Sequence, residues 1–518
     1  MKNTFLSRII YVVLLIFPCG LSLILSLEGL YYSDSETKSF TLCMLLAMMG
    51  ILYLIAKDGE KDKQSEIIFV ISMVLIGFCL RHMATEIINT YPASDSEMAY
   101  TIARKVLHGT ELNRVEKYFN TLHWGTWAML LRDVMKIFGE DLSVVRHFCI
   151  LVSSMNCLFL YIATKKITKN QAIAKIAMVL YVFSPGMIVY AGCLTNVHVA
   201  NSFLLLFFIF LTKLVETQEW RNKLIFTFCT AISLAVFNLF KIMGSVLILA
   251  VIGAIVLYFG VKEWKALFSS SKSRVVEMIC FVAVLVMVNS VVAKIDTKLL
   301  EKRMGIELYQ NTNFEYMLYS TAYVGLNFET GGRYEKNRSL QRRILNEVYK
   351  DVDERSDVMK EMLLEDLKKH KNEIDNLLWV KFGNAWGNEE NIAESAFIST
   401  ALKHSETLSD ESKIVYEDGY KFIRKFLKEL SVAYWIIVMF GACWGAISHM
   451  FGKRNFMALT SSVFLFGFAL ILEIMETSPR YKEIAYFSLI LLAAYGYKYI
   501  YSAIWSIRTR KNTKTKKE

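Results

Sequence analysis

Two carboxylates separated by one residue stand in the polar segment 91–105, which reads YPASDSEMAYTIARK. If this segment is extended, Asp95 and Glu97 point to the same side and could hold a divalent metal or share the role of general base. If it is helical, the two side chains diverge, and Glu97 shares a face with Tyr100 and Arg104. Tyr100 and Arg104 are then candidates for lining a cavity or for binding a substrate that accepts a transferred group (an acceptor site).

A purely structural interpretation of the same carboxylates is also open. Ser94 followed by Glu97 fits the S-x-x-E capping box, in which the glutamate only satisfies backbone donors at the start of a helix. Asp95 could itself be a cap. It follows a turn that contains Pro92, however, and a carboxylate beside such a turn is the better candidate for a catalytic base.

A second polar group lies in EIMETSPRYKE, near the end of the chain, where Glu473 and Glu476 precede Arg480 and Tyr481. The planar guanidinium of arginine binds phosphate through two hydrogen bonds and stays charged, so Arg480 suits an anion at the lipid headgroups. The alternative is an arginine–tyrosine pair that only anchors a helix at the interface. Lys241 is a second possible phosphate partner, or a lysine that only marks the end of a span.

Three further polar residues are weaker candidates for the acceptor site or cavity. His123, next to Trp124, could contact an acceptor, although a packed aromatic pair is the simpler interpretation. Lys381 lies in WVKFGNAWG and could reach the site, but an aromatic membrane anchor is favoured there. Asn196, in LTNVH, could line the cavity.

These residues must be positioned by membrane helices. The chain has 518 residues, of which 54% are hydrophobic, and the apolar residues form runs of roughly 20, the length that crosses a bilayer. The pattern excludes an ordinary cytosolic enzyme and predicts an all-α polytopic membrane protein. The stretch from 223 to 261 is too long for one span and is split near Asn238 and Lys241. About twelve spans are expected, at 7–27, 39–56, 66–83, 147–164, 171–191, 196–214, 223–240, 242–261, 275–294, 430–449, 455–474 and 484–502.

The spans divide the chain into regions. They are N-terminal membrane helices (1–84), a polar loop with the acidic motif and amphipathic helices (85–146), membrane helices four to nine (147–295), a mostly helical insertion (296–429), the last three membrane helices (430–502) and a basic tail (503–518). The net charge of +11 is concentrated in short basic clusters between alternate spans and in the tail. By the positive-inside rule both termini are cytoplasmic, and both polar regions lie outside the plasma membrane.

The sequence carries no nucleic-acid-reading motif and no compact basic domain, so the positive charge indicates membrane topology rather than nucleic-acid binding. All nine cysteines fall in or beside apolar runs, without the spacing of a metal site, and are interpreted as packing residues.

At these motifs the sequence resembles the GT-C superfamily of integral-membrane glycosyltransferases, in its protein O-mannosyltransferase and aminoarabinose-transferase branch as found in Gram-positive bacteria. The resemblance runs from about Tyr91 to Tyr495 and rests on SDSEMAY, KIFGEDLSVVR, VFSPGMIVY, NLFKIMGSVLILA and ETSPRY. The sequence departs from the family pattern at TLHWG, where a proline is usual, and at Asn196, where an acidic residue is usual. Two additional spans precede the acidic loop.

The resemblance implies inverting transfer of a sugar from a polyprenyl-phosphate donor to an extracytoplasmic glycan, teichoic acid, lipid or protein. Asp95, with Glu97, would provide the base, and Arg480, Lys241 and Tyr481 would bind the donor phosphate. A divalent metal at Asp95 and Glu97 is possible, although Asn196 weakens a two-carboxylate site. The sequence itself supports the lipid-linked donor. No nucleotide-binding domain is visible, and an outward-facing transferase without one needs a lipid-linked donor.

Two other functions remain open. A polymerase or ligase of surface polysaccharide would use a lipid-linked glycan as donor. A flippase or transporter of lipid-linked sugars usually has internal repeats and charged or helix-breaking residues near mid-membrane, which the sequence does not clearly show.

Overall fold

A computed structural model describes the protein from residue 2 to residue 514, except at 34, 59–61, 89–91, 93–94, 114–115, 118–121, 271, 306–313, 334–336, 339–340, 342–344, 346–347, 349–350, 388–419 and 452–454. All regular elements within these ranges are helices, so the all-α fold class is confirmed. The twelve elements that correspond in order to the predicted spans are α1 (Lys2–Tyr31), α2 (Ser35–Asp58), α3 (Lys63–Ile88), α7 (Leu142–Thr168), α8 (Gln171–Val182), α10 (Val197–Glu216), α11 (Trp220–Phe240), α12 (Gly244–Ser270), α13 (Lys272–Met304), α21 (Tyr420–Phe451), α22 (Phe456–Ile474) and α23 (Tyr486–Lys514).

Among the described residues, nine helices are long and apolar enough to cross a membrane, which supports a multi-pass membrane protein. In the other three helices, the apolar stretches among the residues whose side chains the structure describes are shorter, at Pro18–Tyr31, Gln171–Val182 and Gly244–Tyr258.

The predicted split between Asn238 and Lys241 is confirmed, because α11 ends at Phe240 and α12 begins at Gly244. The side chain of Asn238 accepts a hydrogen bond of 2.8 Å from the backbone N–H of Gly244. This bond satisfies one of the donors that every helix start leaves without an intrahelical partner.

The fifth predicted span, 171–191, is not one continuous helix. Helix α8 ends at Val182, and a separate short helix, α9 (Pro185–Tyr190), follows it. The side chain of Ser184 caps α9 by accepting from the backbone N–H of Met187, and Pro185 occupies the first turn, where its missing N–H costs nothing. The proline ring is incompatible with continuing α8 through this point, which explains the break.

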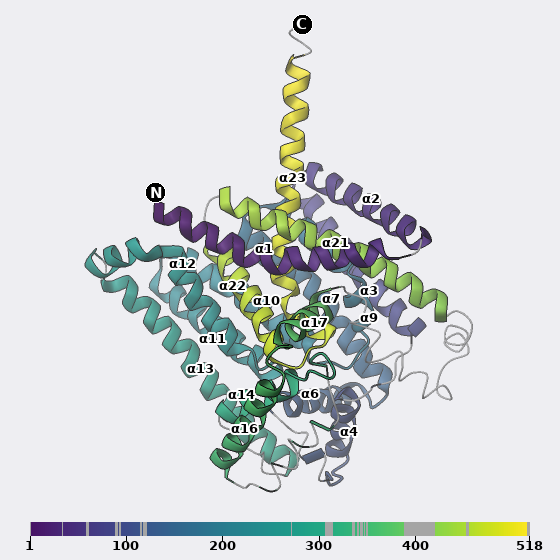
Figure 1. Cartoon of the computed structure of the whole chain (residues 1–518), viewed down its shortest axis with the longest axis vertical. Helices are drawn as coiled ribbons and strands as arrows, with labels where there is room; N and C mark the ends of the chain where they lie inside the picture. The colour runs from purple at the N-terminus through teal and green to yellow at the C-terminus, as the bar shows by residue number, and fades with distance from the viewer. Residues whose placement is uncertain are drawn as a thin grey trace.

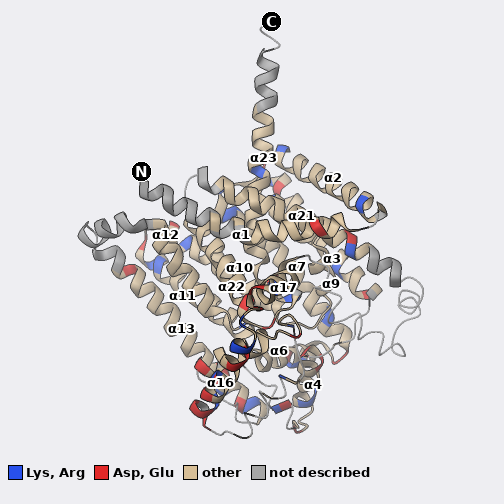
Figure 2. Cartoon of the chain, viewed as in Figure 1, with Lys and Arg blue, Asp and Glu red and all other residues tan. Residues whose placement is uncertain are grey.

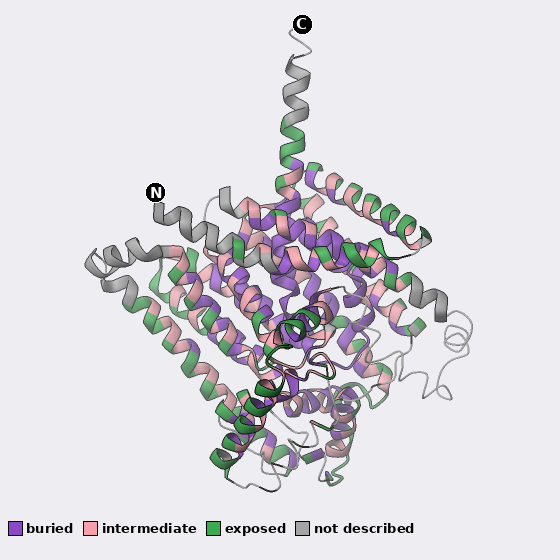
Figure 3. Cartoon of the chain, in the orientation of Figure 1, coloured by how far each residue is buried: buried purple, intermediate pink, exposed green. Residues whose placement is uncertain are grey.

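The buried core runs through the middle of the helical bundle, where α10, α21 and α23 carry many buried side chains (Figure 3). Helices α2 and α13 lie at the periphery, and their exposed residues include apolar ones such as Leu46, Ile279 and Val291 (Figure 3). Apolar side chains on the outside of a helical bundle are expected where lipid surrounds it.

The polar regions gather at one end of the bundle. Helices α4 (Asp95–Leu107), α6 (Leu122–Phe138) and α16 (Val352–Lys369) lie at the end opposite α2 and the C-terminal half of α23 (Figure 1). Charged residues are dense on α4 and α16 and sparse in the middle of the bundle (Figure 2). The insertion also contributes α14 (Phe314–Gly325) and α17 (Ile374–Trp386), so its described elements are helical.

Helix α13 continues through the predicted boundary at 295 and reaches Met304. Its last turns pack against α6. The hydroxyl of Thr126 donates to a carboxylate oxygen of Asp296 at 2.6 Å, and Arg303 forms an ion pair of 3.0 Å with Asp133.

Helices α21 and α23 approach each other at glycines. A Cβ atom added to Gly496 would collide with the backbone carbonyl of Gly441 and the backbone nitrogen of Gly445. A Cβ atom at Gly445 would collide with the backbone of Leu492. Small residues at a helix crossing let two backbones come close, which is the usual way that membrane helices gain packing contacts.

We expect Gly496→Ala to lower the free energy of unfolding by about 1–3 kcal/mol, because the added methyl group forces the two backbones apart. Gly50→Ala is the matched control, since Gly50 lies within α2 and has no atom within 4 Å of the added Cβ. The control should be neutral or stabilising by up to about 1 kcal/mol. Reversible unfolding in mixed detergent measures both, and equal effects of the two variants would contradict this packing.

Candidate functional site

A short 3₁₀ helix, η3 (Pro479–Ala485), places four charged or polar side chains between the membrane helices. It follows the end of α22, and Ser478 enters it in an extended conformation. The element contacts α10, α17, α22 and α23. It is also anchored by Lys482, whose buried ammonium group lies 4.2 Å from the ring centre of Trp435. The surrounding helices therefore fix where Arg480, Tyr481 and Glu483 lie.

Asp95 and Arg480 come together although they lie near opposite ends of the chain. A terminal nitrogen of Arg480, Nη2, is 3.9 Å from Oδ2 of Asp95. The Arg480 side chain is 22% exposed and that of Asp95 is 39% exposed, so both groups are partly shielded and still accessible. The separation exceeds hydrogen-bonding distance, so this pair leaves guanidinium donors available to an anion.

Lys241 joins these two residues from the corner between α11 and α12. Its ammonium nitrogen is 5.8 Å from the ring centre of Tyr481, and the Arg480 guanidinium carbon is 5.5 Å from the same centre. One aromatic ring therefore contacts both cations, an arrangement stabilised by the negative face of the ring. The Tyr481 hydroxyl donates to a carboxylate oxygen of Glu476 at 3.0 Å, which orients the ring.

The electrostatics of this corner favour an anion. Burial, followed by the positive charge of Arg480, lowers the pKa of Lys241 to about 8, while Glu483 and Asp95 act in the opposite direction. Two neighbouring cations repel each other, and an incoming negative group relieves that repulsion. We call Asp95, Lys241, Arg480, Tyr481 and Glu483 the cationic corner.

The other predicted residues of α4 are exposed or contact residues outside the cationic corner. The helix begins at Asp95, so Asp95 and Glu97 project in different directions, and Glu97 is exposed. The Tyr100 hydroxyl donates to the backbone carbonyl of Glu140 at 3.2 Å, and the exposed Arg104 lies over the Tyr100 ring. This geometry does not bring the two carboxylates together as a metal site. Ser94, the predicted partner of Glu97 in a capping box, lies outside the described residues.

His123 lies beside the cationic corner, at the start of α6. Burial, and then the charge of Lys241, lowers the pKa of His123 to about 3, so its imidazole is neutral near pH 7. Its Nδ1 is buried and makes no hydrogen bond within the described part of the chain. The ring also lies 5.5 Å from that of Trp124, so the predicted aromatic packing and a polar role can coexist.

Asn196 is fully buried immediately before α10. Both polar atoms of its side chain lack a hydrogen-bond partner among the residues that the structure describes. Its neighbour Thr195 accepts from the Tyr190 hydroxyl at 3.3 Å, and Tyr190 is close enough to Glu483 and Arg480 to be influenced by their charges. A buried amide is normally hydrogen-bonded, so the Asn196 side chain has hydrogen-bonding capacity that the described residues do not use.

Lys381 is engaged by the protein itself. Its buried ammonium group donates to the backbone carbonyls of Gly325 and Met475, each at 2.6 Å. These bonds join α17 to the end of α14 and to the chain that leaves α22 for η3. Burial lowers the pKa of Lys381 to about 8, against the opposing effect of Glu473 and then Glu476. We therefore interpret Lys381 as a residue that positions η3.

Sequence reasoning missed two residues of this region, Tyr190 and Glu483. Glu483 follows Arg480 by three residues, and it is almost fully buried. The available signal was a glutamate three residues after Arg480, in PRYKE directly before the last predicted span. Tyr190 had no comparable signal, because its place near Arg480 depends on the break at Pro185.

No protein-family model matches this chain, and no curated protein shows significant similarity to it. A solved structure to which it is similar is the crystal structure of ArnT from Cupriavidus metallidurans bound to undecaprenyl phosphate. The two share 10% sequence identity over an alignment that covers 84% of this chain and 78% of that chain, with a TM-score of 0.37. The function proposed below therefore rests on the residues of this chain.

Proposed function

We propose that the protein is a membrane glycosyltransferase that moves a sugar from a polyprenyl-phosphate donor to a hydroxyl group outside the membrane. The observation that carries this proposal is the meeting of the Asp95 carboxylate with two cations, Arg480 and Lys241. Displacing a phosphate from a sugar requires a base for the attacking hydroxyl and positive charge for the departing phosphate, and these three residues provide both.

The reaction would proceed by direct displacement. The carboxylate of Asp95 takes the proton of the acceptor hydroxyl while that oxygen attacks the anomeric carbon of the donor sugar. The bond between the anomeric carbon and the phosphate oxygen breaks, and both electrons of this bond leave with the phosphate. The configuration at the anomeric carbon is inverted, because attack and departure occur on opposite faces.

The charge that develops on the departing phosphate would be stabilised by the cationic corner. Arg480 can donate two hydrogen bonds to phosphate oxygens, and Lys241 contributes a second positive charge. These donors are in place before the reaction, so no reorganisation is needed when the charge develops. Tyr481 contacts both cations and helps to hold them together.

The position of the corner also suits a lipid-linked donor. Lys241 directly follows the candidate span that ends at Phe240, and Arg480 begins another candidate span. Helix ends of this kind lie at the height of lipid phosphates, so a polyprenyl chain can remain in the bilayer while its phosphate reaches the cations. We propose that this end of the bundle faces outward in the plasma membrane and that both termini are cytoplasmic, as the charge distribution predicts.

We expect Asp95→Asn to lower the rate of sugar transfer by roughly 10²–10⁴-fold, because an amide cannot accept the proton. Glu97→Gln is the matched control, since Glu97 is exposed on another face of the same helix and should tolerate the change. The assay is transfer of labelled sugar from undecaprenyl-phosphate sugars to an envelope fraction by proteoliposomes. Wild-type activity in Asp95→Asn would remove Asp95 from the mechanism.

The same assay separates the other functions. Turnover of an undecaprenyl-diphosphate-linked glycan, with none of the monophosphate sugars, would indicate a polymerase or ligase. Movement of the labelled lipid across the vesicle membrane without transfer to any acceptor would indicate a flippase. Either outcome would replace the function proposed here.

We expect binding of undecaprenyl phosphate to weaken as the pH rises through about 8, because Lys241 is charged below its pKa of about 8 and neutral above it. An ordinary lysine would keep its charge until about pH 10. Loss of a charged donor should weaken binding roughly 10- to 100-fold. Lys241→Arg should bind at pH 7 and lose this pH dependence, and Lys241→Met should bind weakly throughout. Identical pH profiles for wild type and Lys241→Arg would show that Lys241 does not contact the phosphate.

A further inference from the structure

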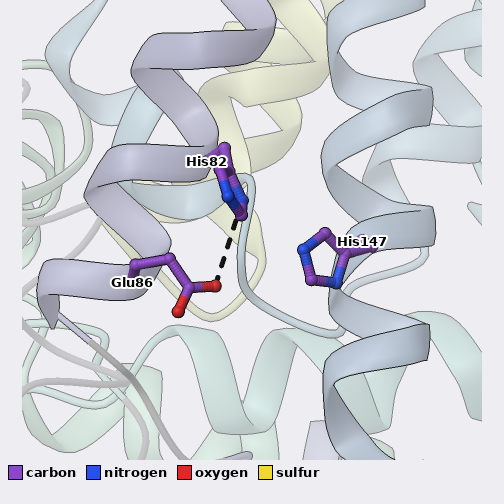
Figure 4. Close-up of side chains that lie close together, drawn as sticks. All are labelled: His82, Glu86 and His147. Atoms are coloured by element: carbon purple, nitrogen blue, oxygen red, sulfur yellow. Dashed lines mark ion pairs between the residues drawn. The ribbon is translucent and has the colours of Figure 1, made fainter.

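Three potential metal ligands, none of them a predicted site residue, converge between α3 and α7. His82 and Glu86 are four residues apart on α3 and therefore share one face, and His147 projects from α7 towards them (Figure 4). Each residue offers one ligand atom, and these three atoms all lie within 4.8 Å of one another. We call this group the histidine cluster.

The distances suit a small cation with modest adjustment of side chains. Nδ1 of His82 is 3.9 Å from Oε1 of Glu86, and the two imidazole ring centres are 5.1 Å apart. Ligand atoms bound to a tetrahedral Zn²⁺ at about 2.0–2.2 Å lie roughly 3.3–3.5 Å apart. Closing the remaining gap of about 1 Å requires only side-chain rotation, because Glu86 and His147 are exposed and His82 is partly exposed.

Each of the two histidines has a ring nitrogen available to bind a metal ion. Nδ1 of His147 lies 2.6 Å from the backbone carbonyl oxygen of Ser143. A carbonyl only accepts, so Nδ1 carries the proton and Nε2 keeps a free lone pair, as in most metal-bound histidines. Nδ1 of His82 is buried and lacks a hydrogen-bond partner in the described ranges.

The position of these residues in the chain adds a second indication. All three lie within candidate membrane spans, His82 and Glu86 near the end of one and His147 near the beginning of the other. Ionisable side chains in such spans are rare and normally have a function or a charged partner. Two imidazoles and a carboxylate form a ligand set suited to zinc and related transition metals rather than to calcium or magnesium.

We propose that His82, Glu86 and His147 bind a divalent transition-metal ion of the zinc class and thereby tie α3 to α7. These helices are the two ends of the polar region that carries α4 and α6. The ion would join the two helices from which this region extends and would stabilise the position of α4, which begins at Asp95. The proposal concerns the metal alone and does not depend on sugar transfer.

The test uses the full chain, purified in detergent and stripped with a chelator. Wild-type protein should bind one Zn²⁺ per chain in calorimetry, and X-ray absorption should show two imidazole nitrogens at about 2.0–2.1 Å. Zinc should also raise the midpoint of thermal unfolding. His82→Ala and His147→Ala should each weaken binding by more than the roughly 10- to 100-fold that loss of an outer-shell partner causes.

Two control variants establish that the zinc binds at the histidine cluster. His108→Ala removes an exposed histidine that pairs with Glu140 at 2.8 Å, and it should leave zinc binding unchanged. Asp95→Asn should also bind zinc normally, which distinguishes this site from a metal at the proposed catalytic base. Absence of stoichiometric zinc in the wild type, an absorption spectrum without imidazole ligands, or equal losses in His108→Ala and His82→Ala would overturn the proposal. The spectrum of the wild type decides the matter even if a histidine variant fails to fold.

Discussion

The ammonium group of Lys381 makes the contact on which the geometry of the cationic corner depends. The chain must leave α22 at Met475 and turn into η3 while surrounded by other helices, and carbonyl groups at a helix end have no intrahelical partner. A buried carbonyl without a partner costs several kcal/mol in an apolar setting, as a rough estimate. Lys381 supplies the partner, and the backbone N–H of Thr477 donates to the carbonyl of Gly332 beside it.

The cationic corner illustrates how a site can be assembled for a charged ligand before the ligand arrives. Arg480 and Lys241 lie near each other with partial compensation from Asp95 and Glu483, so neither acid fully neutralises both cations. In a water-poor environment, each of these interactions is stronger than it would be in bulk solvent. Burial, and then the closeness of Arg480, lowers the pKa of Lys241, and the same closeness increases the gain when a phosphate binds.

The membrane helices were predictable because their signal is local: a run of about twenty apolar residues is sufficient. The break at Pro185 was harder, since the apolar run continues across it and only the proline marks the change. The approach of Asp95 to Arg480 could not follow from spacing, because it depends on how α4, α11 and η3 pack together. The resemblance to a known superfamily suggested it.

The sequence also could not predict the role of a residue whose partners come from distant elements. From the sequence, Lys381 could be part of a membrane anchor or could bind a substrate. Its role becomes clear only from the carbonyl groups it contacts, at the end of α14 and just after α22. His82 and Glu86 have the spacing of neighbours on one helix face, which could have marked them as a pair. His147 could not have been added, because its position opposite them depends on the packing of α3 against α7.

The length of α13 has a geometric consequence for the polar end of the molecule. Its 33 residues rise about 50 Å along the helix axis, whereas the hydrocarbon core is about 30 Å thick. Even at a tilt of about 40° the helix extends past the core by roughly two turns. Its last turns contact α6 through Asp296 and Arg303. The length of α13 therefore sets the distance of α6, and of His123 at its start, from the hydrocarbon core.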